Sequence, residues 1–423
     1  MRPPAAYRLL SAGLGLLLPP LAAGWALAAH WRRRPPPGGA RAWLRQRLGD
    51  PAPVPPGALW LHAASVGELH TALPLLLALL EAQPDLRALV TTVTPGGAAA
   101  LARRLPAAFA DRVRHRYLPF DYRRAVRGFF ARARPRAGLI VETELWPWLY
   151  AAAAEADVPL ALVNARLSAR TLGAPGWLKR AYLGALGALH AVLCRNPEDA
   201  AGFRALGADP ARIAVVGNLK FAPPPGPPPP PAAPGRRYVL AASTHAGEER
   251  LLAAAWGRLA RGDRLLVIAP RYPDRGAQLA AELAAAGWRV SRHSRGEDPA
   301  AADIHLVDTL GELPAWIAGA EWVFVGGSLV PRGGQNVLEA ARLGKAVVTG
   351  PHTFNFADEV ARLAAAGALV QAADAAALEA ACAALLAEPE RAAAMGARGA
   401  ALCQAEADVV DRYRHALAER GLP

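Results

Sequence analysis

From Leu59 onward, short apolar segments alternate with longer Ala- and Leu-rich segments of helical pattern. This alternation is typical of βαβ units, in which helices join the strands of a parallel sheet. The expected strands form two series, one at 58–63, 87–93, 137–142, 158–164, 189–194 and 213–217, and the other at 237–242, 264–269, 288–291, 304–307, 321–326, 345–349 and 368–370. Residues 374–420 are Ala-rich and expected to be helical. We therefore predict an α/β protein with two Rossmann-like domains that face a cleft.

A proline-rich segment separates the two series. Residues 221–235 read FAPPPGPPPPPAAPG, a composition that favours an extended polyproline linker over helix or sheet. A chain of 423 residues also exceeds what one compact core usually serves. We place the first domain at 41–222, the linker at 223–235 and the second domain at 236–423, which includes the C-terminal helices.

The first 40 residues are predicted to form a membrane anchor. Residues 9–31 lack charged side chains, and about 20 apolar residues suffice to cross a bilayer. The arginines after this segment (Arg32–Arg34 and Arg41) outnumber those before it (Arg2 and Arg8), which favours a cytoplasmic globular part. Three isolated cysteines without CxxC spacing also indicate a reducing compartment, with neither a disulfide framework nor a zinc site.

Two other interpretations of the N-terminal segment stay open. Ala26-Leu27-Ala28 resembles a signal-peptide cleavage site, so the segment could be removed. Pro19-Pro20 interrupts the apolar run, which leaves a tilted or monotopic anchor possible.

The charge balance indicates a polyanionic partner. Lys and Arg number 48 and Asp and Glu 35, a formal net charge of +13. Nucleic acid, an anionic membrane surface and a phosphorylated substrate would each suit this charge. The arginines are scattered and do not alternate with aromatic residues, which argues against nucleic acid.

Charged residues follow strands of the first domain at their carboxyl ends, where α/β sheets place ligand groups. Glu68 follows LWLHAAS, although Ser65 and Glu68 would also fit a helix capping box. Glu142 and Glu144 follow GLIV and could converge on one face of an extended segment, or only favour the next helix's dipole. Lys220 precedes the linker and could meet an anion or be an ordinary solvated lysine.

A glycine-rich segment of the second domain, at 321–356, predicts a nucleotide site. Its two glycine pairs, GGSLVPRGG, allow a ligand to approach the backbone closely. Asn336 can cap the helix that follows, whose free N–H groups favour phosphate, and Glu339 could bind ribose hydroxyls. A plain capping box would explain the helix start but not four glycines. The P-loop pattern GxxxxGK[ST] is absent.

Two further segments follow strands at the same predicted sheet edge. Arg271 stands between Pro270 and Pro273, which restrict its turn, and a constrained guanidinium suits phosphate or carboxylate. The alternative is a surface salt bridge. Leu310, Gly311 and Glu312 follow the strand at 304–307, a weaker signal.

Eight motifs in this order resemble those of bacterial Kdo (3-deoxy-D-manno-octulosonic acid) transferases of lipopolysaccharide assembly. They are HAASVGE, VETELWP, NARLSAR, GNLKF, ASTHAGEE, APRYPDR, GGSLVPRGGQN and GPHTFNF, and the resemblance spans essentially residues 5–415. It implies a GT-B fold and metal-independent, inverting glycosyl transfer at the inner membrane, without a cofactor. The implied donor is CMP-Kdo, and the implied acceptor is the 6′-hydroxyl of a tetraacylated bisphosphoryl lipid A precursor, lipid IVA.

The resemblance also implies residue roles. Glu68 matches the catalytic base, and Glu142 and Lys220 match catalytic positions that support the transition state. CMP binding is implied for Pro270, Arg271, Leu310, Gly311, Glu312, Asn336, Val337, Leu338 and Glu339. The sequence departs from the family pattern at four positions, Trp148, Tyr272, Gln335 and Val337. None of these departures removes a charged group with an implied role.

The family's chemistry also suits the charge of this chain. A bisphosphorylated lipid in an anionic membrane would account for the excess of basic residues, without nucleic acid. The first domain would bind the acceptor and the second the donor. The alternatives are another sugar-nucleotide enzyme of this fold, such as an epimerase or hexosyltransferase, and a membrane-anchored polyanion-binding protein or scaffold without chemistry.

Overall fold

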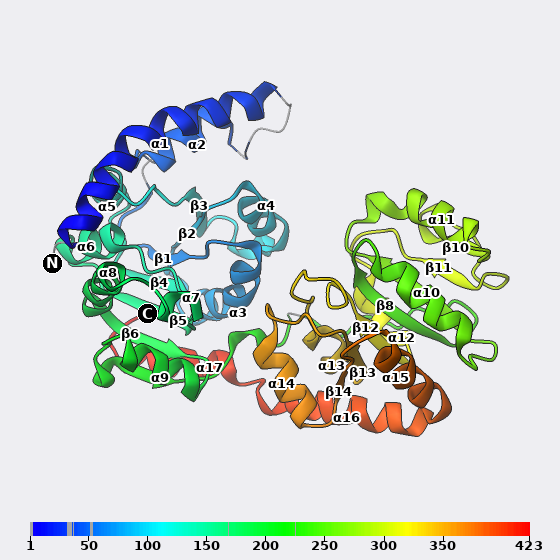
Figure 1. Cartoon of the computed structure of the whole chain (residues 1–423). Helices are drawn as coiled ribbons and strands as arrows, with labels where there is room; N and C mark the ends of the chain where they lie inside the picture. Colours follow the sequence, from blue (N-terminus) through cyan, green and yellow to red (C-terminus); the bar gives the residue numbers. More distant parts are fainter. Residues whose placement is uncertain (1–2, 32–35, 37, 51–53, 168, 225) are drawn as a thin grey trace. The chain divides into compact units, whose positions relative to one another are not determined.

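The chain divides into two compact units in the computed structural model (Figure 1). Unit 1 comprises Met1–Pro224 and Asp408–Pro423, and unit 2 comprises Pro225–Ala407. The structure describes residues 3–31, 36, 38–50, 54–167, 169–224 and 226–423. Arg2 and Arg32–Arg34, which contributed to the predicted charge asymmetry around the anchor, lie outside the described residues.

Unit 1 is built on a parallel sheet of seven strands in the order β3-β2-β1-β4-β5-β6-β7. The strands are β1 (Leu59–His62), β2 (Ala88–Thr92), β3 (Val113–Tyr117), β4 (Ala137–Val141), β5 (Leu160–Ala165), β6 (Leu189–Cys194) and β7 (Ile213–Val215). Every residue of β1, β2, β4 and β5 is buried, as expected for a sheet covered on both faces. The strand order reverses between β1 and β4, which marks the topological switch point of this unit.

Helices cover both faces of this sheet. They are α1 (Ala5–Trp31), α2 (Ala40–Arg47), α3 (Val66–Ala82), α4 (Pro95–Arg104), α5 (Arg123–Ala133), α6 (Pro147–Glu155), α7 (Ala169–Leu172), α8 (Gly176–Gly187), α9 (Pro197–Ala205) and α17 (Val409–Ala418). Alternate strand residues enter two cores: Leu59 and Leu61 pack with α3, α4 and α17, whereas Trp60 packs with α5, α6, α8 and α9.

Strand β3 is absent from the strands predicted from sequence. Its sequence, VRHRY, carries two arginines, and only its first and last residues are buried. It pairs with β2 alone, so it forms an edge of the sheet. Charged residues are favoured on edge strands, which explains why a search for apolar runs missed it.

The C-terminal boundary of the second predicted domain, 236–423, needs a correction. Residues 408–423 belong to unit 1, because α17 buries Val409, Tyr413 and Leu417 in the core shared with α3. The Tyr413 hydroxyl accepts a hydrogen bond from the Asn164 backbone N–H (3.1 Å) and donates to the Gly217 carbonyl (2.9 Å). The chain therefore returns to the first unit after completing the second.

Unit 2 contains a second parallel sheet of seven strands, in the order β10-β11-β9-β8-β12-β13-β14. The strands are β8 (Tyr238–Thr244), β9 (Leu265–Pro270), β10 (Val290–Arg292), β11 (Ile304–Leu306), β12 (Trp322–Val325), β13 (Ala346–Thr349) and β14 (Leu369–Gln371). Its helices are α10 (Glu248–Arg258), α11 (Gly276–Ala285), α12 (Leu313–Gly319), α13 (Leu338–Arg342), α14 (Ala357–Ala365), α15 (Ala375–Ala387) and α16 (Pro389–Ala405). The order reverses between β8 and β12, the switch point of this unit.

The predicted linker, 223–235, contains neither helix nor strand in its described part, 223–224 and 226–235. Its end is attached to unit 2, since the Ala232 N–H donates to the Ala315 carbonyl of α12 (2.9 Å). The three cysteines of the chain are free and buried.

Candidate active site

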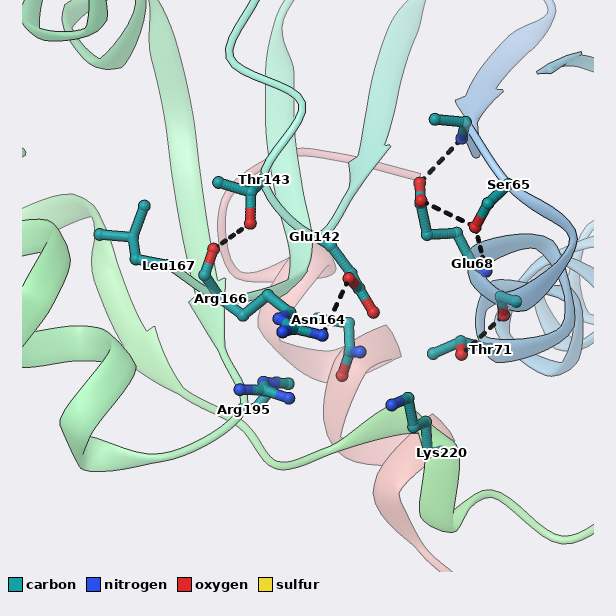
Figure 2. A network of polar contacts seen from close by, with 12 residues as sticks. Ser65, Glu68, Thr71, Glu142, Thr143, Asn164, Arg166, Leu167, Arg195 and Lys220 are labelled. Atoms are coloured by element: carbon teal, nitrogen blue, oxygen red, sulfur yellow. Dashed lines mark hydrogen bonds and ion pairs between the residues drawn. The ribbon is translucent and has the colours of Figure 1, made fainter. Parts of the chain in front are cut away.

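The acidic residues singled out in unit 1 lie at the carboxyl edge of the sheet, next to the switch point. Strands β1 and β4 are hydrogen-bonded neighbours. Glu68 lies in the first turn of α3, shortly after β1, and Glu142 directly follows β4. Ligands of open α/β sheets bind at this kind of position. The fold therefore brings the two carboxylates predicted from sequence to one location (Figure 2).

Glu68 takes part in a capping arrangement at the start of α3. Ser65 is the N-cap, and its hydroxyl accepts from the Glu68 backbone N–H (3.2 Å). In return the Glu68 carboxylate accepts from the Ser65 hydroxyl (2.9 Å) and from the Ala64 N–H (2.8 Å). The capping interpretation is thus confirmed, and these bonds fix where the carboxylate lies.

The surroundings of Glu68 give it a second property. Burial, followed by the negative charges of Glu144 and Glu142, raises the pKa of Glu68 to about 7, and the bonds from Ala64 and Ser65 only partly offset this. A cap residue needs no such shift, and a carboxylate with a pKa near neutrality is well matched to accepting a proton. Glu68 is therefore suited to be a general base while it caps its helix.

Glu142 departs from the extended backbone expected of the segment after β4. Its φ is 62°, in the left-handed region that non-glycine residues rarely adopt. Such a conformation costs about 1–3 kcal/mol and is concentrated at functional sites. Its carboxylate faces the Arg166 guanidinium (Oε2 to Nη1, 3.5 Å) (Figure 2). The prediction of an extended segment is therefore wrong, although Glu142 and Glu144 both lie close enough to Glu68 to raise its pKa.

The alternative role of these acids, at the N-terminus of the next helix, is also excluded. Asp121 occupies that place, since its two oxygens accept from the Trp148 N–H (3.2 Å) and the Leu149 N–H (2.8 Å) of α6. No acidic residue stands in the first turn of this helix. Glu142 and Glu144 thus do not cap this helix.

Glu144 and His62 form a neighbouring pair that sequence reasoning did not assign. The Trp146 indole donates to Glu144 Oε2 (2.7 Å), which lies 4.0 Å from His62 Nε2. Burial would raise the pKa of Glu144, but His62 and Trp146 outweigh this effect and lower it. Glu144 thus stays ionised beside Glu68 and helps keep the pKa of Glu68 high.

Asn164 connects the remaining predicted residue, Lys220, to this edge. Asn164 is fully buried at the end of β5, with φ 52°, and its side-chain oxygen accepts from the Leu219 N–H (2.9 Å). This bond holds the short 3₁₀ turn Leu219–Phe221 that carries Lys220. In the view of Figure 2, Asn164 lies between Glu142 and Lys220. The sequence signal for this role is an Asn at the end of a predicted buried strand, because Asn tolerates positive φ better than most residues do.

The nucleotide-site prediction in unit 2 falls at its own switch point. The glycine-rich loop follows β12, which pairs with β8. Buried Glu248, at the start of α10, holds this loop: its carboxylate accepts from the backbone N–H groups of Gly327 (2.6 Å), Ser328 (2.9 Å) and Leu329 (2.8 Å). It also accepts from His245 N–H (2.8 Å). Glu248 belongs to the motif ASTHAGEE, whose sequence alone does not indicate this role.

Close packing against neighbouring backbone explains why some positions of this loop must be glycine. A Cβ on Gly326 would lie 2.6 Å from the Thr244 Cα and 2.7 Å from the Ser243 carbonyl oxygen, so no side chain fits. Gly333 adopts φ 90°, which other residues avoid. The glycines therefore allow the loop to lie against the end of β8, and not only a ligand to approach.

Arg271 is an exposed cation at this edge. Its backbone N–H donates to the Thr244 carbonyl (2.9 Å), which fixes the turn after β9. Its guanidinium lies 5.8 Å from the centre of the Tyr272 ring and forms no ion pair with the residues that the structure describes. The surface salt bridge considered as an alternative is therefore wrong. Pro270, the last residue of β9, is buried.

The other predicted CMP-binding segments lie after β11 and β12. Leu310 is 81% exposed, Gly311 has φ 95°, and Glu312 accepts from the Thr309 hydroxyl, which lowers the pKa of Glu312. Asn336 accepts from the Leu338 N–H (3.1 Å) and donates to Glu339 (3.2 Å). The N-cap of α13 is Val337, so the prediction that Asn336 caps this helix is wrong, and its side chain instead closes the turn before the helix.

Two predicted members of the nucleotide site have no side chain available. Val337 and Leu338 are 1% and 0% exposed. A ligand at this turn would meet their backbone and the side chains of Asn336 and Glu339.

Comparisons with known proteins find chains of similar sequence. A family model described as 3-deoxy-D-manno-octulosonic-acid transferase (kdotransferase) matches residues 42–223. The chain is 39% identical over 386 residues to the 3-deoxy-D-manno-octulosonic acid transferase of Bordetella pertussis. The aligned region covers 88% of this chain and 89% of the relative. The chain is 32% identical over 330 residues to the protein of the same name from Haemophilus influenzae, covering 74% and 76% of the two chains.

Among solved structures, the chain is similar to UDP-GlcNAc 2-epimerase from Neisseria meningitidis bound to UDP-GlcNAc. The TM-score is 0.57, with 12% sequence identity, over 86% of this chain and 100% of that one. At this identity the similarity concerns the fold alone. Together with two parallel seven-stranded sheets, it is consistent with the two-domain GT-B architecture.

Proposed function

The chain belongs to the 3-deoxy-D-manno-octulosonic acid (Kdo) transferase family of glycosyltransferases, and from this premise we propose that it transfers Kdo from CMP-Kdo to the 6′-hydroxyl of a tetraacylated lipid A precursor. The observation that carries the proposal is Glu68: a fixed carboxylate with a pKa of about 7, at the switch point of unit 1. An inverting transfer needs one such base and no covalent intermediate.

In the proposed reaction, Glu68 removes the proton of the acceptor hydroxyl as its oxygen attacks the anomeric carbon of Kdo. The bond from this carbon to the CMP phosphate breaks, and CMP leaves with the bonding electrons while Glu68 holds the proton. The transition state has oxocarbenium character, so a nearby carboxylate such as Glu142 stabilises its positive charge. Lys220 engages an anion, either the Kdo carboxylate or the phosphate.

Unit 2 binds the CMP part of the donor in this proposal. Arg271 has no protein acid as a partner among the described residues, which leaves its guanidinium for the departing phosphate. Asn336 and Glu339, with the segments at 270–271 and 310–312, contribute polar groups for the phosphate and the ribose. The buried side chains of Val337 and Leu338 support the turn, and the Leu338 N–H holds the Asn336 side chain in place.

The protein is attached to the inner membrane by its N-terminus, with both units in the cytoplasm. Of the described helices, α1 has the length and apolar composition to cross a bilayer, over Ala5–Gly24. A membrane location suits an acceptor that is itself a lipid. Unit 1, which carries the base, then receives this acceptor.

Ligand competition tests the donor. CMP should stabilise the full-length protein against heat and inhibit Kdo transfer, whereas UDP at the same concentration should do neither. Stabilisation by UDP and not by CMP would instead favour a different sugar-nucleotide enzyme of this fold and would overturn the proposed donor.

A further inference from the structure

Helix α1 is fastened along the surface of unit 1. The Tyr7 hydroxyl donates to Asp121 Oδ2 (2.5 Å), and the Trp148 indole donates to the Ser11 hydroxyl (2.6 Å). Tyr7 and Ser11 are four residues apart, so both lie on one face of the helix. These contacts tie α1 to the loop that precedes α5 and to the start of α6.

The same face stays in contact further along the helix. Gly15, four residues after Ser11, lies so close to the Tyr122 ring that an added Cβ would be 3.4 Å from it. Ala22 is 6% exposed and packs in a cluster with Trp43 and Tyr117. The contacts therefore run from residue 7 to residue 22, about 22 Å of helix at 1.5 Å per residue.

Away from these contacts, the helix exposes apolar side chains between Leu9 and Leu21. It carries six leucines whose exposed fractions run from 40% to 79%, namely Leu9, Leu10, Leu14, Leu16, Leu17 and Leu21. A row of exposed leucines over the length of a helix that is docked on its other side fits the hydrocarbon boundary of a membrane.

This docking is incompatible with a helix that crosses the bilayer at right angles to its surface. The hydrocarbon core is about 30 Å thick. Beyond Ala22 only the nine residues to Trp31 remain in the helix, about 14 Å, and everything before them lies against unit 1. The helix therefore lies along the unit, with one face against the protein and the other toward lipid.

A basic pocket opens beside this helix. It has a volume of about 400 Å³, and three arginines line it: Arg8 of α1, with Arg123 and Arg124 at the start of α5. All three are exposed, and their guanidinium groups have no hydrogen-bond or ion-pair partner within the part of the chain that the structure describes.

The acid nearest in sequence to this pocket does not neutralise it. Asp121 directs its two oxygens to the Tyr7 hydroxyl and to the N–H groups of Trp148 and Leu149. Leu16, one of the exposed leucines, also lines the pocket. Three unpaired cations thus stand where the apolar face of α1 begins.

We propose that α1 is an in-plane membrane anchor and that the pocket formed by Arg8, Arg123 and Arg124 binds the phosphate headgroup of an anionic bilayer phospholipid. Guanidinium groups match phosphate oxygens in geometry and charge, and the leucines beside them accommodate acyl chains. The proposal rests on the membrane attachment proposed above and is independent of the transfer reaction.

Vesicle sedimentation of the full-length protein tests the pocket. The variant R8Q/R123Q/R124Q should bind phosphatidylglycerol-containing vesicles about a hundredfold more weakly than the wild type, and phosphatidylcholine vesicles equally well. The control R87Q/R103Q/R104Q loses the same charge at exposed arginines of unit 1 outside the pocket, and should bind as the wild type does. Equal binding of the two triple variants to phosphatidylglycerol-containing vesicles would overturn the proposed role of the pocket.

Two further measurements distinguish failure of the proposed pocket from failure of membrane attachment. Millimolar inorganic phosphate should not release the wild type from the vesicles; release would mean that a free anion occupies the pocket. A wild type that binds neither kind of vesicle would overturn membrane attachment itself. A circular dichroism spectrum and a urea unfolding midpoint equal to those of the wild type show that each variant is folded, including unit 1, in which the substitutions lie.

Cysteine labelling in sealed vesicles tests the in-plane orientation. The native cysteines are buried, so a membrane-impermeant maleimide reports on A5C, at the start of α1, and R41C, in α2. Both sites should react from the side on which the globular units lie. Labelling of A5C from the opposite side alone would show that α1 crosses the membrane and would overturn the proposal.

Discussion

Replacing Glu68 with Gln should abolish transfer and, above neutral pH, stabilise the fold. The folded protein raises the pKa of Glu68 from 4.5 to about 7, and at about 1.4 kcal/mol per pH unit ionised Glu68 costs at most about 3.5 kcal/mol. Gln lacks the charge but loses one of the bonds to Ala64 and Ser65, worth about 1 kcal/mol. With solvent screening of this partly exposed group, the net gain should be about 1 kcal/mol.

The sign of the effect depends on pH. Below pH 4.5 the carboxyl group is protonated in both the folded and unfolded states, so its burial as an anion costs nothing. Between pH 4.5 and 7 the unfolded chain ionises first and the cost grows, and above pH 7 it is complete. The stabilisation by Glu68→Gln should therefore be present at pH 8 and absent at pH 4.5.

Thermal unfolding at both pH values, with a transfer assay at pH 8, measures this. Transfer should fall by about 10²–10⁴-fold, the usual contribution of a general base. Ser65→Ala is the matched control, because it removes the N-cap hydroxyl and keeps the Glu68 carboxylate: it should destabilise the protein by about 1 kcal/mol at pH 4.5 and by more at pH 8, where the ionised carboxylate also loses a donor. Loss of stability in Glu68→Gln at pH 8 as well as at pH 4.5 would mean that Glu68 is only a cap and would refute the reasoning.

Three other substitutions probe the remaining contacts. Arg271→Ala should weaken CMP binding about 10–100-fold in calorimetry, since a charged hydrogen bond is lost, while Arg250→Ala, an exposed arginine of α10, should not; equal effects would exclude a specific role for Arg271. Tyr413→Phe should destabilise unit 1 by about 1–3 kcal/mol in urea, because the Asn164 N–H and the Gly217 carbonyl lose a buried partner; an unchanged midpoint would contradict this. Glu248→Gln should speed hydrogen exchange at Gly327–Leu329, because the Glu248 carboxylate accepts hydrogen bonds from these three backbone N–H groups. Unchanged exchange would show that the loop does not depend on Glu248.

Most strands of both sheets could be predicted because parallel strands covered on two faces are apolar throughout. The sequence GLIV of β4 is an example, with every residue buried. The edge strand β3 lacks this signal, since Arg114 and Arg116 point away from the core. The placement of α17 in unit 1 was equally hidden, because an Ala-rich helix does not indicate which core receives Tyr413.

The position of the site was easier to predict than its contacts. Polar residues after strands predicted the carboxyl edges, and Glu68 with Ser65 matched a capping pattern readable from spacing. Two features depend on which strands are neighbours. One is the left-handed backbone of Glu142, and the other is the set of hydrogen bonds that Glu248 accepts from a loop some 80 residues away. Such contacts between distant segments arise only from the folded topology.

Mass spectrometry of the lipid product tests the central claim most directly. Full-length protein is incubated with CMP-Kdo and a tetraacylated lipid A precursor, and the lipid and the nucleotide are analysed together. The wild type should yield a lipid that carries Kdo and a matching amount of free CMP, and the Glu68→Gln variant should yield neither. An unmodified lipid in the wild-type reaction, or equal product from the variant, would contradict the account.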